Sequence, residues 1–124
     1  MENKYKSTLF DLSNEIAIVT GGLGYLGSQF SLTLLESGAK VVILDISGST
    51  YNNKLKDLIS LGDNIAVMKI DITNKNDLIS TSKKICNDIG TPTVLINNAA
   101  IDSPPNASIE ENGPFETYPE KILG

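Results

Sequence analysis

The residues best suited to chemistry are a group of glycines that begins at position 21. Residues 20–27 read Thr-Gly-Gly-Leu-Gly-Tyr-Leu-Gly, and the last six of them form a Gly-x-Gly-x-x-Gly pattern. The pattern follows an apolar run and precedes an amphipathic segment, which predicts a turn from a strand into a helix. Glycines at such a turn let an anion approach bare backbone N–H groups, and the helix N-terminus adds about half a positive charge. We therefore predict a phosphate-binding loop formed by Gly21, Gly22, Leu23, Gly24, Tyr25, Leu26 and Gly27.

An acidic residue follows the next apolar run at a distance that suits a dinucleotide. Asp45 lies 24 positions after Gly21, near the spacing at which a carboxylate binds the ribose of NAD. Its charge would repel the 2′-phosphate of NADP by about 1 kcal/mol in water and about 4 kcal/mol at an effective dielectric constant of 20, for a separation of about 4 Å. Residues 46–49 carry no cation that would offset this repulsion. We predict NAD in preference to NADP, with Asp45 and Ile46 in the cofactor site; a tight glycine turn without a ligand is the alternative.

Short β-branched runs alternate with amphipathic segments, which is typical of βαβ units and a mainly parallel sheet. Strands are expected at residues 15–20, 40–44, 65–70 and 93–97, and helices at residues 25–37, 52–61 and 76–89. Glycines mark the expected helix ends, at Gly38, Gly62 and Gly90. The side chains expected to face the core are Leu26, Phe30 and Leu34 in the first helix, Leu55, Leu58 and Ile59 in the second, and Leu78, Ile85 and Ile89 in the third, with Cys86 packed beside them.

Three motifs in order along the chain resemble the short-chain dehydrogenase/reductase family. They are Ile-Val-Thr-Gly-Gly at 18–22, Asp-Ile-Thr at 71–73 and Asn-Asn-Ala-Ala at 97–100. The resemblance implies an α/β fold, a Rossmann-type doubly wound parallel sheet in the order 3-2-1-4, with the dinucleotide beyond the carboxyl ends of the strands. It also implies that Asp71 and Ile72 contact the adenine end of the cofactor. The motif formed by Asn97, Asn98, Ala99 and Ala100 would steady the central strand and line a ribose.

Each of these polar residues has a plainer interpretation as well. Asp71 could cap the helix that follows it, and Asn97 could satisfy backbone groups where its strand ends. The spacing of Gly21, Gly24 and Gly27 is more typical of the family's extended branch, the nucleotide-sugar epimerases and dehydratases, whereas Asn-Asn-Ala-Ala is typical of the main dehydrogenase branch. We give the second motif more weight.

The catalytic Ser and the Tyr-x-x-x-Lys pair of this family lie well beyond the fourth strand. Tyr118 and Lys121 stand three positions apart instead of four, and Pro119 places Tyr118 at or before a helix start, so we assign them no catalytic role. We predict no catalytic residue in these 124 residues. The chain is then the cofactor-binding portion of an NAD-dependent oxidoreductase of alcohols and ketones. A dinucleotide-binding module without catalysis, and a portion of an epimerase or dehydratase, are the alternatives.

Composition narrows the remaining classes of function. The length suits one NAD(P)-binding domain, with an arm at 1–14, a βαβ core at 15–100, and a loop and helix start at 101–124 that leave it incomplete at its C-terminus. A formal net charge of -5 argues against nucleic acid as a partner. With no histidine and one cysteine, the sequence predicts no metal site, no internal disulfide and no Ser-His-Asp chemistry. The lack of a long apolar run or secretory leader predicts a cytoplasmic protein without a membrane span.

The fourth expected strand is patterned for the middle of a sheet. Residues 94–96 read Val-Leu-Ile, yet no further strand is expected beside them. We therefore predict a fragment or truncated form, with homo-oligomer formation or association through that strand edge. The other expected partners are the dinucleotide and, in a full-length relative, a small-molecule substrate whose identity the sequence does not define.

Overall fold

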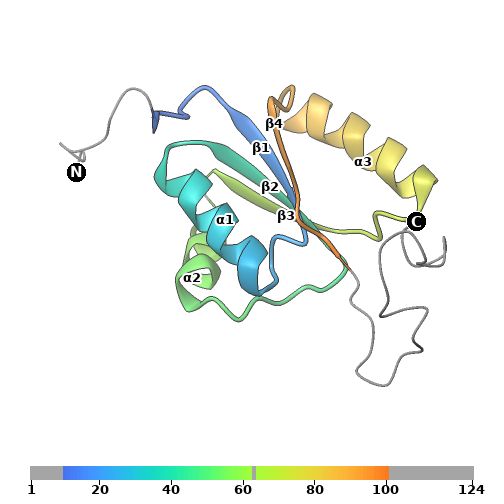
Figure 1. Cartoon of the computed structure of the whole chain (residues 1–124). Helices are drawn as coiled ribbons and strands as arrows, with labels where there is room; N and C mark the ends of the chain where they lie inside the picture. The colour runs from blue at the N-terminus through green and yellow to red at the C-terminus, as the bar shows by residue number, and fades with distance from the viewer. Residues whose placement is uncertain (1–9, 63, 101–124) are drawn as a thin grey trace, which may run out of the picture.

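The computed structural model describes residues 10–62 and 64–100, which form one parallel sheet with three helices. The strands are β1 (Ile16–Thr20), β2 (Lys40–Asp45), β3 (Ile65–Lys69) and β4 (Val94–Asn97). They lie in the order β3-β2-β1-β4, and every neighbouring pair is parallel (Figure 1). This confirms the predicted order 3-2-1-4. It also places the carboxyl ends of β1 and β4 side by side, where a doubly wound sheet changes direction.

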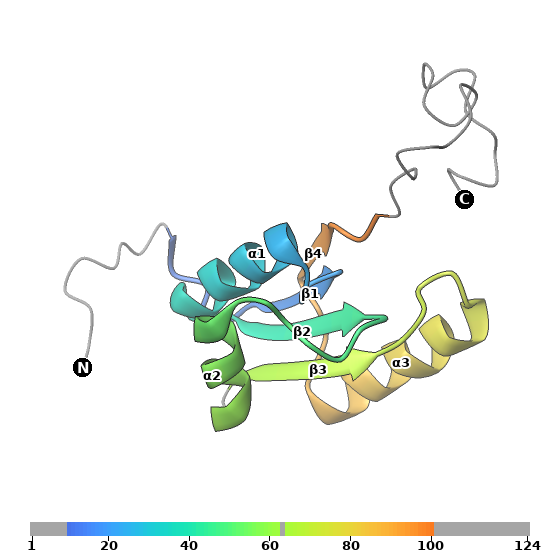
Figure 2. The same ribbon diagram turned by 90° about the horizontal axis from the view of Figure 1, so that it is seen from below.

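The helices cover the two faces of the sheet unequally. Helices α1 (Tyr25–Glu36) and α2 (Asn53–Leu61) lie on one face, and α3 (Lys75–Asp88) lies on the other (Figure 2). Right-handed crossovers explain the arrangement, because the chain moves outward from β1 to β3 and then returns to the far side of β1. Each predicted terminating glycine, Gly38, Gly62 and Gly90, has a positive φ, which a residue with a Cβ adopts only at a cost.

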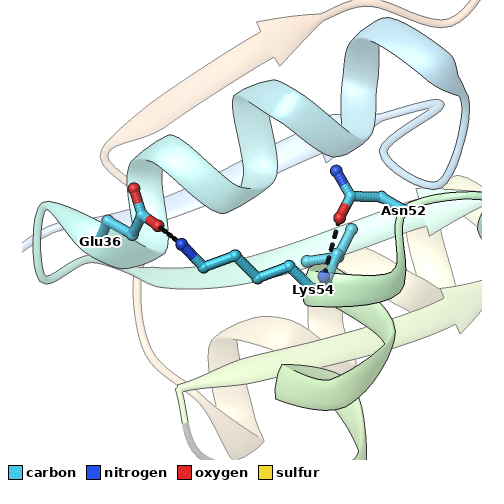
Figure 3. Close-up of polar contacts among 4 residues, drawn as sticks. Glu36, Asn52 and Lys54 are labelled. Atoms are coloured by element: carbon cyan, nitrogen blue, oxygen red, sulfur yellow. Dashed lines mark hydrogen bonds and ion pairs between the residues drawn. The ribbon is translucent and has the colours of Figure 1, made fainter.

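Side-chain caps fix where the second and third helices begin. The Oδ1 of Asn52 accepts a hydrogen bond from the Leu55 N–H at the start of α2, and Asn74 caps α3 in the same way. Figure 3 shows the Asn52 cap of α2. It also shows Lys54, whose Nζ lies 2.6 Å from Oε1 of Glu36 at the end of α1. Both ion-pair partners are exposed, so the pair contributes less than about 1 kcal/mol.

Two apolar clusters form the core, one on each face of the sheet. On the face covered by α1 and α2 the buried residues are Val19, Leu23, Ala39, Val41, Ile43 and Leu55. On the α3 face they are Val42, Leu44 and Ile85, with a larger fringe of half-buried isoleucines. Residue Leu12, in the segment before β1, packs against the first cluster and donates its N–H to the Ser37 carbonyl.

The prediction of which side of α1 faces the sheet was wrong. Leu26 is 56% exposed and Phe30 is 38% exposed, while Leu34 packs only partly against the core. The buried positions of α1 are instead Gly27, Ser28, Ser31 and Leu32. Small residues allow the start of α1 to approach the backbone of the preceding loop more closely than leucine or phenylalanine would. The close approach of α1 to the preceding loop therefore decides which side of the helix faces the sheet, although another side is more apolar.

Two predictions on α3 were also wrong. Leu78 is 37% exposed and the Cys86 side chain is exposed. The first turns of α3 extend past the end of β3 (Figure 2), so the sheet does not cover them. Cys86 follows the buried Ile85 by one position, about 100° around the helix, and so turns away from the sheet.

Among the described strands, β4 forms one rim of the sheet, and Leu95 at its middle is 58% exposed. Leu95 lies in register with Ile18 of β1, which belongs to the α3-side cluster. The exposed surface of β4 therefore lies on the face that α3 alone covers among residues 10–62 and 64–100.

Candidate functional site

The glycine loop lies between β1 and α1, at the carboxyl end of the sheet. The Gly21 N–H donates to the carbonyl of Leu44 at the end of β2, over 2.8 Å. Gly21 has a φ of +64°, and its carbonyl accepts the Gly24 N–H over 3.1 Å. The first helical bond of α1 runs from the Ser28 N–H to the Gly24 carbonyl, over 2.9 Å. The loop is thus a strand-to-helix turn that is fixed by backbone bonds at both ends.

Three of its four glycines have an internal reason to lack a side chain. A Cβ on Gly27 would lie 2.1 Å from the Gly21 carbonyl oxygen, and one on Gly22 would lie 2.8 Å from the Ile43 side chain. Gly21 combines its positive φ with a would-be contact of 3.0 Å to the Cα of Ala99. These glycines serve close packing of the loop against β2, α1 and the segment after β4.

Gly24 is different from the other three. Its φ of -71° and ψ of -179° are open to any residue. A Cβ there would meet only the Gly21 carbonyl oxygen, at 3.4 Å, which is ordinary van der Waals contact. The protein's own packing therefore gives no reason for glycine at this position.

The N-terminus of α1 is prepared to receive an anion. Gly24 is the N-cap and has no side chain with which to bind the amides of the first turn, formed by Tyr25, Leu26 and Gly27. That turn contains no acidic side chain, so no side chain of the turn offsets the partial positive charge of the helix end. The Tyr25 and Leu26 side chains point into solvent. These two predicted site residues can therefore offer backbone N–H groups to a ligand in the space before the helix.

Asp45 lies beside this loop and is bonded to it. Its Oδ2 accepts the Leu23 N–H over 3.0 Å, and its Oδ1 accepts the Ser47 N–H over 2.8 Å. One carboxylate thus joins the glycine loop to the segment that leaves β2. Each carboxylate oxygen has a second lone pair, so Asp45 can still accept a hydroxyl of a ligand. The neighbouring Ile46 is exposed.

The segment after β4 is fastened to the glycine loop by a threonine and an asparagine. The Thr20 Oγ1, at the end of β1, accepts the N–H groups of Asn98 and Ala99, each over 3.1 Å. The Asn98 Nδ2 donates to the Gly21 carbonyl over 3.1 Å. The Asn97 side chain is exposed and bonds no described residue, so the interpretation that Asn97 satisfies the strand end was wrong. Asn98 performs that role.

Thr20 is a residue that our sequence reasoning missed as part of the site. The signal was present, since a buried hydroxyl directly before a glycine turn needs partners and can reach the neighbouring strand end. Ala99 reaches the glycine loop through its backbone, whereas Ala100, the last described residue, is exposed.

Asp71 follows β3, at the other rim of the sheet. Its Oδ1 accepts both the hydroxyl and the N–H of Thr73, over 2.6 and 2.9 Å. The hydroxyl bond first, and the backbone bond second, lower the pKa of the Asp71 carboxyl below its ordinary value. Asn74 caps α3, so the interpretation of Asp71 as the cap was wrong. Ile72 is half-buried in the α3-side cluster.

The structure therefore brings together part of the predicted site. The glycine loop is hydrogen-bonded to the Asp45 carboxylate and to the Asn98 side chain. Thr20, at the end of β1, binds the backbone of Asn98 and Ala99. Asp71 and Ile72 stand apart from them, beyond the end of β3, and no bond links them to the loop among the described residues. Within residues 10–62 and 64–100, no three acidic or cysteine side chains gather as a metal site would require. No described helix has the length and apolar character to cross a membrane.

Comparison with known families decides how this site is classified. The family model for short chain dehydrogenases matches residues 15–121. The chain belongs to this family. Its members bind a nicotinamide cofactor, and the described strands and glycine loop lie within the matched residues.

Individual proteins similar to this chain are also short chain dehydrogenases or share their fold. Over 90 residues the chain is 37% identical to a short chain dehydrogenase/reductase of Colletotrichum higginsianum, covering 73% of this chain and 34% of the relative. Over 100 residues it is 27% identical to the 7alpha-hydroxysteroid dehydrogenase of Escherichia coli K12, covering 81% and 39%. A short chain dehydrogenase of Leptospira borgpetersenii, solved with bound NAD+, has the same fold, with a TM-score of 0.68 and 20% identity over 99% of this chain and 44% of that one. The chain thus spans less than half the length of these relatives.

Proposed function

We propose that this chain forms the NAD-binding part of an oxidoreductase that transfers hydride between a nicotinamide cofactor and an alcohol or ketone. The bound cofactor would supply the hydride acceptor or donor. The described residues would bind the cofactor, orient it and select it. None of them is assigned a catalytic role, and the 124-residue sequence contains no Tyr-x-x-x-Lys pair.

The observation that carries the proposal is the contrast between Gly24 and the other loop glycines. Gly21, Gly22 and Gly27 are explained by packing, and Gly24 is not. We propose that a methyl group on Gly24 would enter the space before the N-terminus of α1, where no side chain caps the helix. A pyrophosphate that lies against this backbone explains both the glycine and the absence of a capping side chain.

The preference for NAD over NADP is supported by Asp45. Backbone bonds to Leu23 and Ser47 fix the carboxylate between the glycine loop and the segment after β2. A ribose whose pyrophosphate lies at α1 would place its hydroxyls near this carboxylate, which accepts hydroxyls and repels a phosphate. We propose that Ile46 covers the same ribose and that Asp71 and Ile72 contact the adenine. Asn98 and Thr20 would act through the loop by holding Gly21 in place.

A second candidate is a module that binds the dinucleotide without turnover. It is supported by the same glycine loop and Asp45, which would bind a dinucleotide whether or not turnover follows. Both candidates predict binding, and they separate when NADH formation is followed with a panel of secondary alcohols. Turnover by the purified chain would exclude the second candidate.

The substitution Gly24→Ala tests the proposed site. We expect NADH affinity, measured by isothermal titration calorimetry, to fall by about tenfold or more, because displacing the anion costs one or two charge-assisted hydrogen bonds of about 1.5–3 kcal/mol each. The thermal midpoint should not fall, since the Cβ has room and the φ is ordinary. Gly48→Ala is the matched control, because its Cβ would meet nothing within 4 Å. Equal NADH affinity in Gly24→Ala and the parent chain would contradict the proposal.

A further inference from the structure

The last residues of β2 and β3 bring opposite charges together. Asp45 and Lys69 are register partners in the parallel pair β2–β3. The Ile70 N–H donates to the Asp45 carbonyl over 3.0 Å, which holds the two strand ends together one residue further on. Neighbouring strands lie about 4.8 Å apart, so the backbone at Lys69 is as close to Asp45 as two strands allow.

Both side chains leave the sheet on the same face. Val41 and Ile43 in β2, and Ile65 and Val67 in β3, all belong to the cluster beneath α1 and α2. Side chains alternate along a strand, so Asp45 and Lys69 fall on this face as well. It is the face that carries the glycine loop, because Leu23 belongs to the same cluster.

The two partners differ in how they are held. Asp45 is fixed by backbone amides on both of its oxygens. The Lys69 side chain is exposed and forms no ion pair or hydrogen bond with any other described residue. Its ammonium group is therefore free to move on a flexible four-carbon stem around the position of Asp45.

We propose that Lys69 determines how strictly this cofactor site discriminates against a 2′-phosphate. The inference rests on the proposed dinucleotide site and refines its selectivity. A phosphate on the ribose beside Asp45 would meet the repulsion of that carboxylate, and the Lys69 ammonium would reach the same phosphate from the neighbouring strand and offset part of the repulsion. The site then prefers NAD and still accepts NADP. Residues 46–49 contain no such cation, whereas the strand register supplies one from a position 24 residues beyond Asp45.

The test is Lys69→Met, which removes the charge and keeps most of the stem. Titrations by calorimetry at low ionic strength would use NADH and NADPH, together with 5′-AMP and 2′,5′-ADP, which differ only in the 2′-phosphate. We expect Lys69→Met to weaken NADPH and 2′,5′-ADP by about three- to tenfold, and to change NADH and 5′-AMP by less than about twofold. The difference should shrink at high salt, because exposed charges are screened.

The matched control is Lys84→Met, an exposed lysine on α3 at the other face of the sheet. It changes the net charge by the same amount and should leave the ratio of NADPH to NADH affinity unchanged. An unchanged ratio in Lys69→Met, or an equal loss for both dinucleotides, would overturn the role of Lys69 alone. A parent chain that binds neither dinucleotide would instead overturn the proposed function, and the role of Lys69 with it.

Discussion

The two faces of the sheet differ in how completely their side chains are buried. On the α1 and α2 face, Val19, Leu23 and Ile43 are at most 2% exposed, and two helices cover the strands. On the α3 face the equivalent positions Ile16 and Ile18 are half-buried. One helix covers that face among the described residues, and the strand residues fully buried there are Val42 and Leu44 of β2.

This difference shows what the tight packing is for. Leu23, the side chain at the centre of the glycine loop, is part of the dense face, and Gly22 lies against Ile43 of the same cluster. The proposed anion site is therefore positioned by well-packed core, although the ligand itself would lie in the open. Rigid placement of backbone donors is what binding a pyrophosphate requires, because donors that are already ordered lose little entropy on binding.

The largest effect is expected from Gly27→Ala, which forces the dense face open. Its Cβ would lie 2.1 Å from the Gly21 carbonyl oxygen, a backbone atom that cannot rotate away. We expect a loss of about 3 kcal/mol or more in the free energy of unfolding. Urea denaturation followed by circular dichroism measures it. Stability near that of the parent chain would mean that α1 does not approach the loop as closely as the structure shows.

The next largest effects are expected from one matched substitution on each face of the sheet. Ile43→Ala empties a fully buried position and Ile18→Ala a half-buried one, at central positions of neighbouring strands. We expect losses of about 3–4 and about 1–2 kcal/mol respectively, because the cost follows the contacts and the cavity left behind. Both changes are the same in chemistry and in strand propensity, so each is the other's control in urea denaturation. Equal losses would show that the α3 face is as well covered in solution as the α1 and α2 face.

Periodicity and composition were enough to predict the elements and their order. Continuous apolar runs predicted the four strands, and Gly38, Gly62 and Gly90 predicted the helix ends, where each has a positive φ. These features depend on residues near one another in the chain. The strand order came from the family resemblance, and the parallel pairings confirm it.

Features that depend on residues far apart in the chain were harder to predict. The face of α1 followed the close approach of Gly27 to Gly21, which no stripe of large apolar residues reveals. Asn98 and not Asn97 bonds the loop, because side-chain alternation, continued past β4, places Asn98 on the same face as Ile96, the face that carries the glycine loop. Lys69 met Asp45 only through the register of β2 with β3. In each case the missing information was a pairing in space.

The smallest expected effect lies at the end of β3, beyond both clusters, where Asp71 binds Thr73. The Thr73 hydroxyl and N–H stabilise the charged carboxylate, so the folded-state pKa of Asp71 is lower than its ordinary value of 3.8. A depressed carboxyl pKa contributes stability that is present above about pH 4 and is lost as the pH falls through the folded-state value.

Thr73→Ala removes the hydroxyl bond and keeps the backbone bond, so the Asp71 pKa should return part of the way toward 3.8. A carbon-detected NMR titration of the carboxyl group measures this, with Asp77, whose backbone N–H binds Asn74, as the reference in the same spectra. Because Asp71 is fully exposed, the midpoint of acid unfolding should move little, and a large change there would mean that the turn after β3 supports the α3 face more than its contacts indicate.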